Sequence, residues 1–350
     1  MTSLPEDAAE LTCKAEKCLK TSFLKRTPDY DSAVEYYTKA ALLCRNAKRL
    51  DASAELYQKV AELHFKLGSY FYCAKNYETA ALIYKDLQQY EQMADLITKA
   101  GDLLRKAGSP DSAGYVYERA AKALEKSLPI RAAEFYESAA DACQVEDKYH
   151  EASDHFNSAA RVWVRLHRFE KAEKALRSYV DCVQLGNPDS TAATIGGFSD
   201  SSAVPKLCAR AVVVLILIKL HLGDEVAAEK VYSEAVAKWC FLETDENRSV
   251  KQLISAYEER DPEAFAVAIK ASCFRLLDLD YVRLMKEIKV VPSRESKAEK
   301  LKSEVHSNAS PSSFENRSPS KNDSAQVSTT YVPASEAFED EEDEIKEDIC

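Results

Sequence analysis

The sequence predicts an all-helical protein, in which antiparallel helix hairpins stack into a solenoid, followed by a helical bundle and a disordered acidic tail. Two observations support this fold class. A large, mostly aromatic residue followed by a pair of small residues recurs about every 20 residues through the first half of the chain. In addition, only 8 of the 350 residues are glycine, against a usual share of about 7%, whereas β-hairpins and phosphate-binding loops depend on glycine.

The repeat appears when the chain is aligned with itself at a shift of 19 or 20 residues. Its large position is occupied in turn by Tyr37, Tyr57, Tyr77, Ile97, Tyr117, Tyr136, Phe156 and Leu176. A second series marks the expected helix boundaries, at Tyr30, Leu50, Tyr70, Tyr90, Pro110, Ile130, Tyr149 and Phe169. Each unit holds one helix of about four turns and a short link, so neighbouring helices run antiparallel. Because the large residue and the small one share a helix face, we expect most of these side chains in the core.

Beyond the repeats, three changes of pattern divide the chain. A stretch rich in Ser, Thr, Gly and Asp predicts a loop over 186–204. Helical patterns return at about 205–222, 225–241, 246–259, 262–272 and 276–289. Asp261 followed by Pro262 predicts the N-cap of one of these helices. Past Pro292 serine is frequent and apolar periodicity is lost, which predicts disorder. The expected organisation is a repeat array over 1–185, the loop, a helical bundle over 205–291 and a disordered tail over 292–350.

Motifs and charge argue against catalysis, cofactors and nucleic acid. No GxGxxG or GxxxxGK[ST] occurs, so nucleotide chemistry is not expected. His150 and His155 resemble the HExxH metal motif with one residue too many, which turns the second imidazole roughly 140° away from the first. The last 15 residues hold a net charge of −8 out of −11, which leaves −3 for the other 335. Such a nearly neutral body does not suit binding to phosphates, and we expect no catalytic residue, metal or cofactor.

The chain start and the apolar runs predict a cytoplasmic protein without a membrane span. MTSLPEDAAELT lacks the basic and apolar segments of a signal peptide. The ten cysteines include no CxxC pair and are expected as reduced thiols. The longest apolar run, Ala211 to Ile218, is far shorter than the roughly 20 residues of a spanning helix. It predicts a buried core helix.

Three features are candidates for contacts with partners. Phe23 and Leu24 beside two cations suit a bilayer surface, or alternatively cap the core of the first hairpin. Basic residues between Arg161 and Arg177 form either a patch for an acidic partner or ordinary solvent-facing charges. The acidic tail ends in Asp348-Ile349-Cys350, an apolar tip that suits docking to a cationic surface.

Several segments together resemble a known family. They are the stretch from Lys14 to Lys25, Pro28-Asp-Tyr30-Asp31-Ser-Ala33, Pro110-Asp-Ser-Ala113, Glu118-Arg119-Ala120 and the acidic end with its terminal cysteine. With these segments the chain resembles the soluble NSF-attachment proteins, the SNAP family, and its gamma branch in particular. The resemblance covers about 1–290 and the last dozen residues.

The resemblance implies a TPR-like, right-handed array that binds assembled, syntaxin-type SNARE four-helix bundles and recruits the hexameric ATPase NSF, which separates the SNAREs. It implies an adaptor in vesicle-mediated transport, not an enzyme, that associates peripherally with endomembrane lipid. The implied membrane contacts are Phe23, Leu24, Lys25 and Arg26. Candidate SNARE contacts are Arg119, Arg161, Arg165 and Arg168. The implied NSF-coupling residues are Glu341, Glu342, Asp343, Glu344 and Ile349.

The alternative is a generic TPR-type interaction scaffold or co-chaperone. Such a protein would use the same stacked helix hairpins. A TPR hairpin takes about 34 residues, whereas two units take about 40 here. The longer repeat favours the SNAP-like interpretation.

Overall fold

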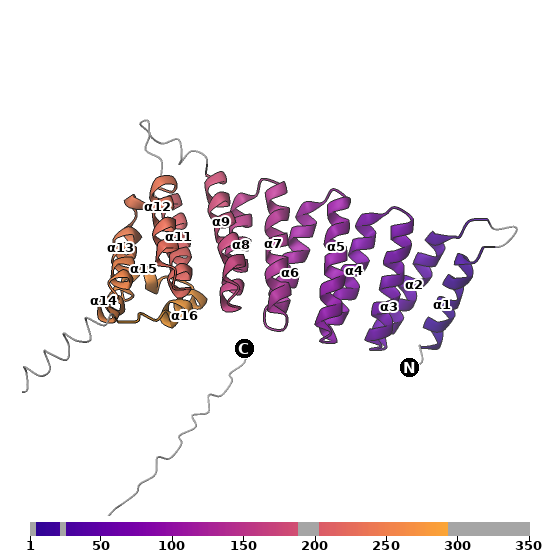
Figure 1. The fold of residues 1–350 in the computed structure, drawn as a ribbon. Coiled ribbons are helices and arrows are strands. Elements are labelled where there is room, and N and C mark those ends of the chain that lie inside the picture. Colours follow the sequence, from indigo (N-terminus) through magenta and orange to yellow (C-terminus); the bar gives the residue numbers. More distant parts are fainter. Residues whose placement is uncertain (1–4, 22–25, 188–202, 293–350) are drawn as a thin grey trace, which may run out of the picture. The chain divides into compact units, whose positions relative to one another are not determined.

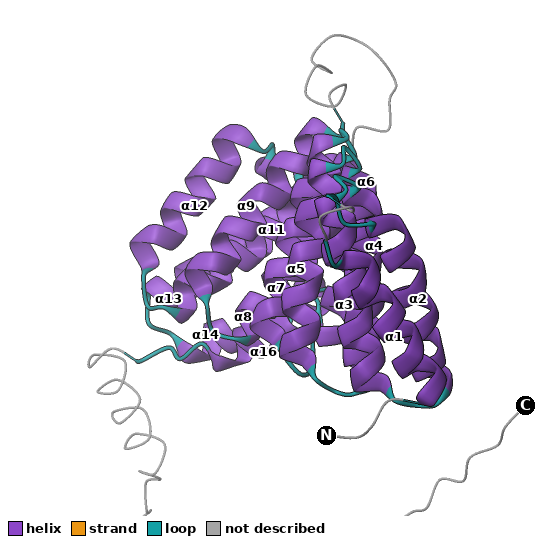
Figure 2. Cartoon of the chain, turned by 90° about the vertical axis from the view of Figure 1, so that its right-hand side faces the viewer, coloured by secondary structure: helices purple, strands orange, loops and turns teal. Residues whose placement is uncertain are grey.

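The computed structural model describes residues 5–21, 26–187 and 203–292, which form helices joined by short loops (Figures 1 and 2). No strand occurs within these ranges. All of them belong to one compact unit of the chain, Met1–Glu299. The predicted all-helical fold class is therefore confirmed. The predicted tail, and most of the predicted loop, lie outside the described residues, and the predicted domain boundaries stay a prediction.

The first half of the chain forms the predicted row of repeat helices. The 20-residue period does not predict α1 (Glu6–Leu19), which precedes the first repeat unit. The next eight helices begin within one residue of the predicted boundaries. They are α2 (Tyr30–Asn46), α3 (Leu50–Lys66), α4 (Tyr70–Asp86), α5 (Tyr90–Lys106), α6 (Pro110–Leu124), α7 (Pro129–Val145), α8 (Tyr149–Arg165) and α9 (Phe169–Leu185). Each helix packs along the one that follows it in the chain, as Figure 1 shows.

The aromatic and small residues of the repeat form the core between these helices. The paired alanines are fully buried, and Tyr37, Tyr57, Tyr117 and Tyr136 are at most 7% exposed. Tyr117 of α6 lies directly over Gly101 of α5, which stands where the neighbouring repeats have alanine. The expected core role of these tyrosines is therefore confirmed.

The turns between the repeat helices share one backbone conformation. A residue with φ between 54° and 73° recurs at the same register, at Lys48, Gly68, Gln88, Gly108, Asp147 and His167. The amide of the residue after it donates to a carbonyl five residues back, for example Arg49 N to Cys44 O at 2.8 Å. This is the 6→1 bond of a Schellman helix end. Only two of these six residues are glycine, although a left-handed backbone costs other residues roughly 1–2 kcal/mol. The low glycine content therefore coexists with turns that favour glycine.

From α4 onward, ion pairs connect each repeat helix, or the turn beside it, to the next helix but one. They join side chains about 40 residues apart: Glu78 with Arg119 at 2.6 Å, Asp95 with Arg131 at 3.2 Å, Asp111 with Lys148 at 2.5 Å, Glu125 with Arg165 at 2.6 Å and Glu134 with Lys171 at 3.7 Å. Because consecutive helices run in opposite directions and pair into hairpins, a contact between a helix and the next but one joins adjacent hairpins. They join the units in addition to the apolar core.

The C-terminal helices begin with α11 (Ala203–His221), in which the predicted apolar run is buried as expected. The other elements are α12 (Glu225–Lys238), η1 (Phe241–Glu243), α13 (Asp245–Glu258), α14 (Pro262–Ala268), α15 (Ser272–Arg275) and α16 (Leu279–Glu287). The Asp261 carboxylate accepts from the Glu263 and Ala264 amides, which confirms the predicted N-cap. The predicted helix over 262–272 is too long. It ends at Ala268 because the Lys270 and Ala271 amides bond three residues back in a tight turn.

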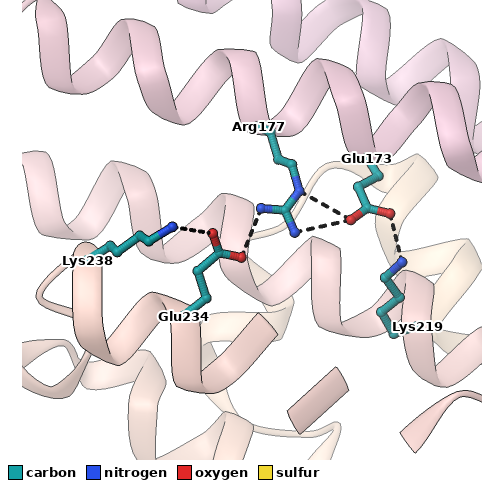
Figure 3. A network of polar contacts seen from close by, with 5 residues as sticks. All are labelled: Glu173, Arg177, Lys219, Glu234 and Lys238. Atoms are coloured by element: carbon teal, nitrogen blue, oxygen red, sulfur yellow. Dashed lines mark hydrogen bonds and ion pairs between the residues drawn. The ribbon is translucent and has the colours of Figure 1, made fainter. Parts of the chain in front are cut away.

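A charge network of five side chains attaches these C-terminal helices to the repeat array (Figure 3). Arg177 of α9 pairs with Glu173 on its own helix at 3.2 Å and with Glu234 of α12 at 3.0 Å. Lys219 of α11 pairs with Glu173 at 2.7 Å, and Lys238 pairs with Glu234 at 3.0 Å. Burial alone would raise the pKa of Glu173 and Glu234, but the hydrogen bonds and charges of their cationic partners hold both pKa values below the usual range.

Candidate interaction surface

The described residues include only part of the predicted contact segments. Phe23, Leu24 and Lys25 lie outside them, and so do the NSF-coupling residues Glu341, Glu342, Asp343, Glu344 and Ile349. Arg26 is described and is exposed, directly after the first of these gaps. The membrane and NSF contacts therefore stay predictions.

Arg119 is held by an intramolecular contact between α6 and α4. Its Nη2 lies 2.6 Å from Oε1 of Glu78, and Lys75 Nζ lies 3.0 Å from the other carboxylate oxygen. The Glu78 side chain is only 10% exposed. Removal of Arg119 would therefore leave a largely buried carboxylate with a single cation, a change that costs stability as well as surface charge.

An exposed strip of aromatic and cationic side chains surrounds this contact. Lys75 lies over the Phe71 ring at 5.8 Å, and Arg119 lies over the Tyr115 ring at 5.6 Å. Tyr72 extends the strip, with its ring 5.8 Å from Phe71. The three rings are 39–61% exposed. We call Phe71, Tyr72, Lys75, Tyr115 and Arg119 the aromatic strip.

Sequence reasoning missed the aromatic strip, although a signal for it exists. Tyr70, Phe71 and Tyr72 are consecutive, and three successive positions span about 200° of a helix circumference. Only one face of α4 packs on the array, so consecutive aromatics cannot all be core. Aromatic residues with arginine are typical of the centres of protein interfaces, which makes the strip a candidate contact surface.

Arg161 and Arg165 of α8 lie where α16 packs against the array. Arg165 pairs with Glu125 at 2.6 Å and lies 3.7 Å from Asp280 of α16. Burial alone would raise the pKa of Glu125, but the hydrogen bond and charge of Arg165 lower it. Arg161 is half-buried, and its Nε has no hydrogen-bond partner among the described residues. Arg165 therefore helps to hold α16 against the array, and the two arginines do not form a freely exposed patch.

Arg168 differs from the other three predicted SNARE contacts. It is exposed in the turn before α9, and within the described ranges no carboxylate forms an ion pair with it. It lines a shallow pocket with Trp163, Phe169 and Lys171. Lys171 lies over the Trp163 ring at 4.2 Å, and Trp163 Nε1 donates to Glu137 at 2.7 Å. Arg168 is thus available to an acidic partner without the loss of an internal contact.

In the part of the chain that the structure describes, no helix has the length and apolar character required to cross a bilayer. The described chain combines stacked helices with exposed aromatic and cationic side chains. This combination defines a helical-repeat protein with a surface suited to a macromolecular partner.

Comparison with known proteins identifies the family. A family model described as soluble NSF attachment protein, SNAP, matches residues 6–179. A gamma-soluble NSF attachment protein of Arabidopsis thaliana is 24% identical over 285 residues, which cover 81% of this chain and 92% of that protein. A Dictyostelium discoideum protein of the same name is 22% identical over 277 residues, covering 79% and 81%. The chain belongs to the soluble NSF attachment protein family.

One solved structure is also similar to this chain, but much more weakly. BtubC from P. vanneervenii is 15% identical, with 73% of this chain and 94% of that chain covered and a TM-score of 0.30. A likeness this weak adds nothing to the assignment, which rests on the family model and the two relatives.

Proposed function

We propose that this protein is a trafficking adaptor that binds assembled SNARE bundles and recruits NSF, so that ATP hydrolysis by NSF separates the SNAREs. The observation that supports this function most directly is the match to the SNAP family model over the repeat helices. The adaptor itself supplies binding surfaces, and the ATPase belongs to its partner. It acts in the cytoplasm, at the surface of endomembranes.

The aromatic strip and Arg168 are the surfaces that we propose for SNARE contact. Tyrosine and arginine supply most of the binding free energy in many interfaces, because they offer a large area and directional polar groups. In this proposal, Tyr115 and Phe71 contact the bundle through their exposed rings, and Arg168 attracts its acidic side chains. Arg119 keeps an indirect role, since it holds Tyr115 and Glu78 in place.

A scaffold that captures a short peptide is the second candidate. It would need a narrow groove with cations that bind the terminal carboxylate of the peptide. Five cations of the repeat array, Arg119, Arg131, Lys148, Arg165 and Lys171, are paired with carboxylates of neighbouring hairpins. These pairs favour a broad contact with a rod-like bundle over capture of a peptide end.

The first experiment is a pull-down with an assembled, syntaxin-type SNARE bundle, with and without NSF and a non-hydrolysable ATP analogue. The wild-type protein should bind the bundle and bring NSF onto it, and should raise the ATPase rate of NSF. Failure of both binding and stimulation would contradict the adaptor function.

The double variant Phe71→Ser with Tyr115→Ser should weaken bundle binding by at least about tenfold, the loss of about 1.4 kcal/mol. Leu242→Ser, at another exposed apolar position, is the matched control.

A charge reversal tests Arg168 separately. Arg168→Glu should weaken bundle binding, mainly at low salt where exposed charges act over the longest range. Lys230→Glu makes the same charge change at an exposed position of α12 and should bind like wild type. Equal loss in both variants would mean that the protein's net charge, not this site, controls binding.

The terminal segments are tested on liposome-anchored SNAREs. We propose that Phe23 and Leu24, with Lys25 and Arg26, contact the membrane, and that 336–350 couples to NSF. Phe23→Ser with Leu24→Ser should slow disassembly on liposomes but not in detergent solution. A loss of helix content by circular dichroism would instead place these residues in the core.

Deletion of 336–350 should leave bundle binding intact and reduce NSF stimulation, and an unchanged disassembly rate would rule out the coupling role.

A further inference from the structure

Three potential metal ligands meet near the C-terminal end of the described chain. His167 lies in the turn after α8, His221 is the last residue of α11 and Glu287 is the last residue of α16. One donor atom of each, an imidazole nitrogen or a carboxylate oxygen, lies within 4.8 Å of the other two. Among the described residues, no other group of histidine, cysteine, aspartate and glutamate satisfies this criterion. None of the contacts proposed above for SNAREs, NSF or lipid uses these three side chains.

The three side chains lie at helix ends that favour a cation. His221 and Glu287 end their helices, and His167 follows the last residue of α8 by two positions. The C-terminal end of a helix carries roughly half a negative charge, so a carboxylate there is disfavoured unless a cation is near. In the described part of the chain, Glu287 forms no ion pair with a lysine or arginine. A bound cation would offset the charge of both the carboxylate and the helix ends.

Packing already fixes the position of the His221 imidazole. Its ring centroid lies 5.0 Å from that of Phe169 and 6.1 Å from that of His167. Its Nδ1 is buried and has no hydrogen-bond partner among the described residues. A buried nitrogen without a partner costs stability. An imidazole held in this way has lost part of its freedom before any ligand binds, which favours metal coordination.

We propose that His167, His221 and Glu287 form a binding site for a divalent transition-metal ion, with Zn²⁺ as the best match. Two imidazole nitrogens and one carboxylate oxygen are a common set of three protein ligands for Zn²⁺, with a fourth position for water. At metal–ligand distances of about 2.0–2.1 Å, tetrahedral donors stand about 3.3 Å apart. The present separation therefore has to close by about 1.5 Å at most. His167 and Glu287 are exposed, so their side chains can rotate to close it.

Metal binding would tie together three parts of the chain that meet only in the folded state. α16 already packs on α8 and α11. Its contacts with α8 include Asp280 with Arg165 and the Tyr281 hydroxyl, which donates to Asn157. A metal ion at the end of α16 would add a second attachment, to the turn between α8 and α9. The metal would thus stabilise the seat of α16 on the repeat array.

The sequence could not predict this site, and led us to expect no metal. The three residues are 54 and 66 positions apart and form no local motif. The pair that resembled a motif, His150 and His155, belongs to α8 and is separate from this group. The proposal is also independent of SNARE binding, because it concerns the attachment of α16 and is measured without any partner.

The test is Zn²⁺ titration of the untagged full-length protein against a chromophoric chelator, with Co²⁺ absorption as a report on coordination. Wild type should bind one Zn²⁺ per chain at this site, show a tetrahedral Co²⁺ spectrum and melt at a higher temperature with Zn²⁺. His221→Ala and Glu287→Gln should each weaken binding by at least about tenfold and lose the thermal shift. His150→Ala removes an exposed histidine elsewhere and should bind like wild type.

Two results would overturn the proposal. One is the absence of stoichiometric Zn²⁺ binding by the wild type. The other is equal affinity in wild type, His221→Ala and Glu287→Gln, which would place the metal at other histidines or thiols. Glu287→Gln keeps the size and shape of the side chain, so a folded variant is available for this comparison, and circular dichroism verifies its helix content.

Discussion

Replacement of Gly101 by alanine tests the packing of the repeat helices most directly. Gly101 lies inside α5, and the equivalent repeat positions, such as Ala81 and Ala121, are alanine. By helix propensity alone, Gly101→Ala should stabilise the protein by about 1 kcal/mol. The structure predicts the opposite, because a Cβ atom at Gly101 would lie 2.1 Å from Cζ and 2.2 Å from the hydroxyl of Tyr117.

The magnitude follows from how firmly Tyr117 is held. Ordinary carbon contacts are about 3.5–4.0 Å, so the ring would have to move by roughly 1.5 Å. Tyr117 is 1% exposed, stacks on Phe135 at 5.7 Å and accepts a hydrogen bond from Arg105 at 3.1 Å. Overpacking of such a site costs about 1–3 kcal/mol. Gly101→Ala should therefore leave the protein at best as stable as wild type, and at worst about 2 kcal/mol less stable.

Gly114 of α6 provides a matched control. The nearest atom to a Cβ there is the Ala142 Cβ at 3.5 Å, an ordinary contact. Gly114→Ala should therefore stabilise by up to about 1 kcal/mol. The propensity effect cancels between the two variants, so their difference measures the overpacking alone, about 1–3 kcal/mol.

Thermal unfolding followed by circular dichroism is the assay, and 2 kcal/mol corresponds to about 4–8 °C for a domain of this order of size. Tyr117→Leu in the Gly101→Ala background should recover part of the loss, as a double-mutant cycle measures. If Gly101→Ala raised the melting temperature as much as Gly114→Ala, the packing argument would be wrong.

Three further predictions concern turns, charges and thiols. Both turn residues Gly68 and Gln88 have positive φ, so Gly68→Ala should lower the free energy of unfolding by about 1 kcal/mol and Gln88→Gly should raise it by a similar amount. Chemical denaturation measures both changes, and equal shifts of the same sign would refute the prediction. Arg177→Met should cost about 1–2 kcal/mol. The carboxylates that Arg177 contacts, Glu173 and Glu234, have lowered pKa values, so the stability they contribute is complete above about pH 4.5 and is lost as the pH falls through their folded-state pKa values. The melting temperature of wild type should therefore fall more on acidification than that of Arg177→Met. Finally, burial raises the pKa of Cys208 to about 12, so iodoacetamide at pH 8 should label exposed Cys13 before Cys208. Peptide mass spectrometry measures the labelling, and equal labelling of these two cysteines in the native protein would contradict the burial of Cys208.

The repeat helices were predictable because their signals are local. The boundary positions, occupied by aromatic residues and by residues such as Pro110, recur at a spacing of about 20, and every side chain that defines a helix start lies within a few residues of it. The C-terminal helices follow no repeat, and the sequence extended the helix from Pro262 beyond its true end at Ala268. Its termination depends on a tight backbone turn that no single residue type marks.

For the candidate contact residues, the sequence could not predict which side chains are paired within the fold. The sequence grouped Arg119, Arg161, Arg165 and Arg168 by charge alone. The fold pairs Arg119 with Glu78 and Arg165 with Asp280 of α16, half-buries Arg161 and leaves Arg168 exposed. These partners come from helices about 40 to 120 positions away, so a one-dimensional pattern contains no information about which cations are already neutralised.

By itself, the sequence determined that this protein is a stack of helices with a fixed 20-residue period, since hydrophobic periodicity and turn residues act over short distances. It also determined the family, through segments that match along the chain. Only the tertiary structure decided which arginines remain free, why Gly101 differs from Gly114, and that His167, His221 and Glu287 meet. These features depend on side chains from distant segments, and only the packing of helices brings them within contact distance.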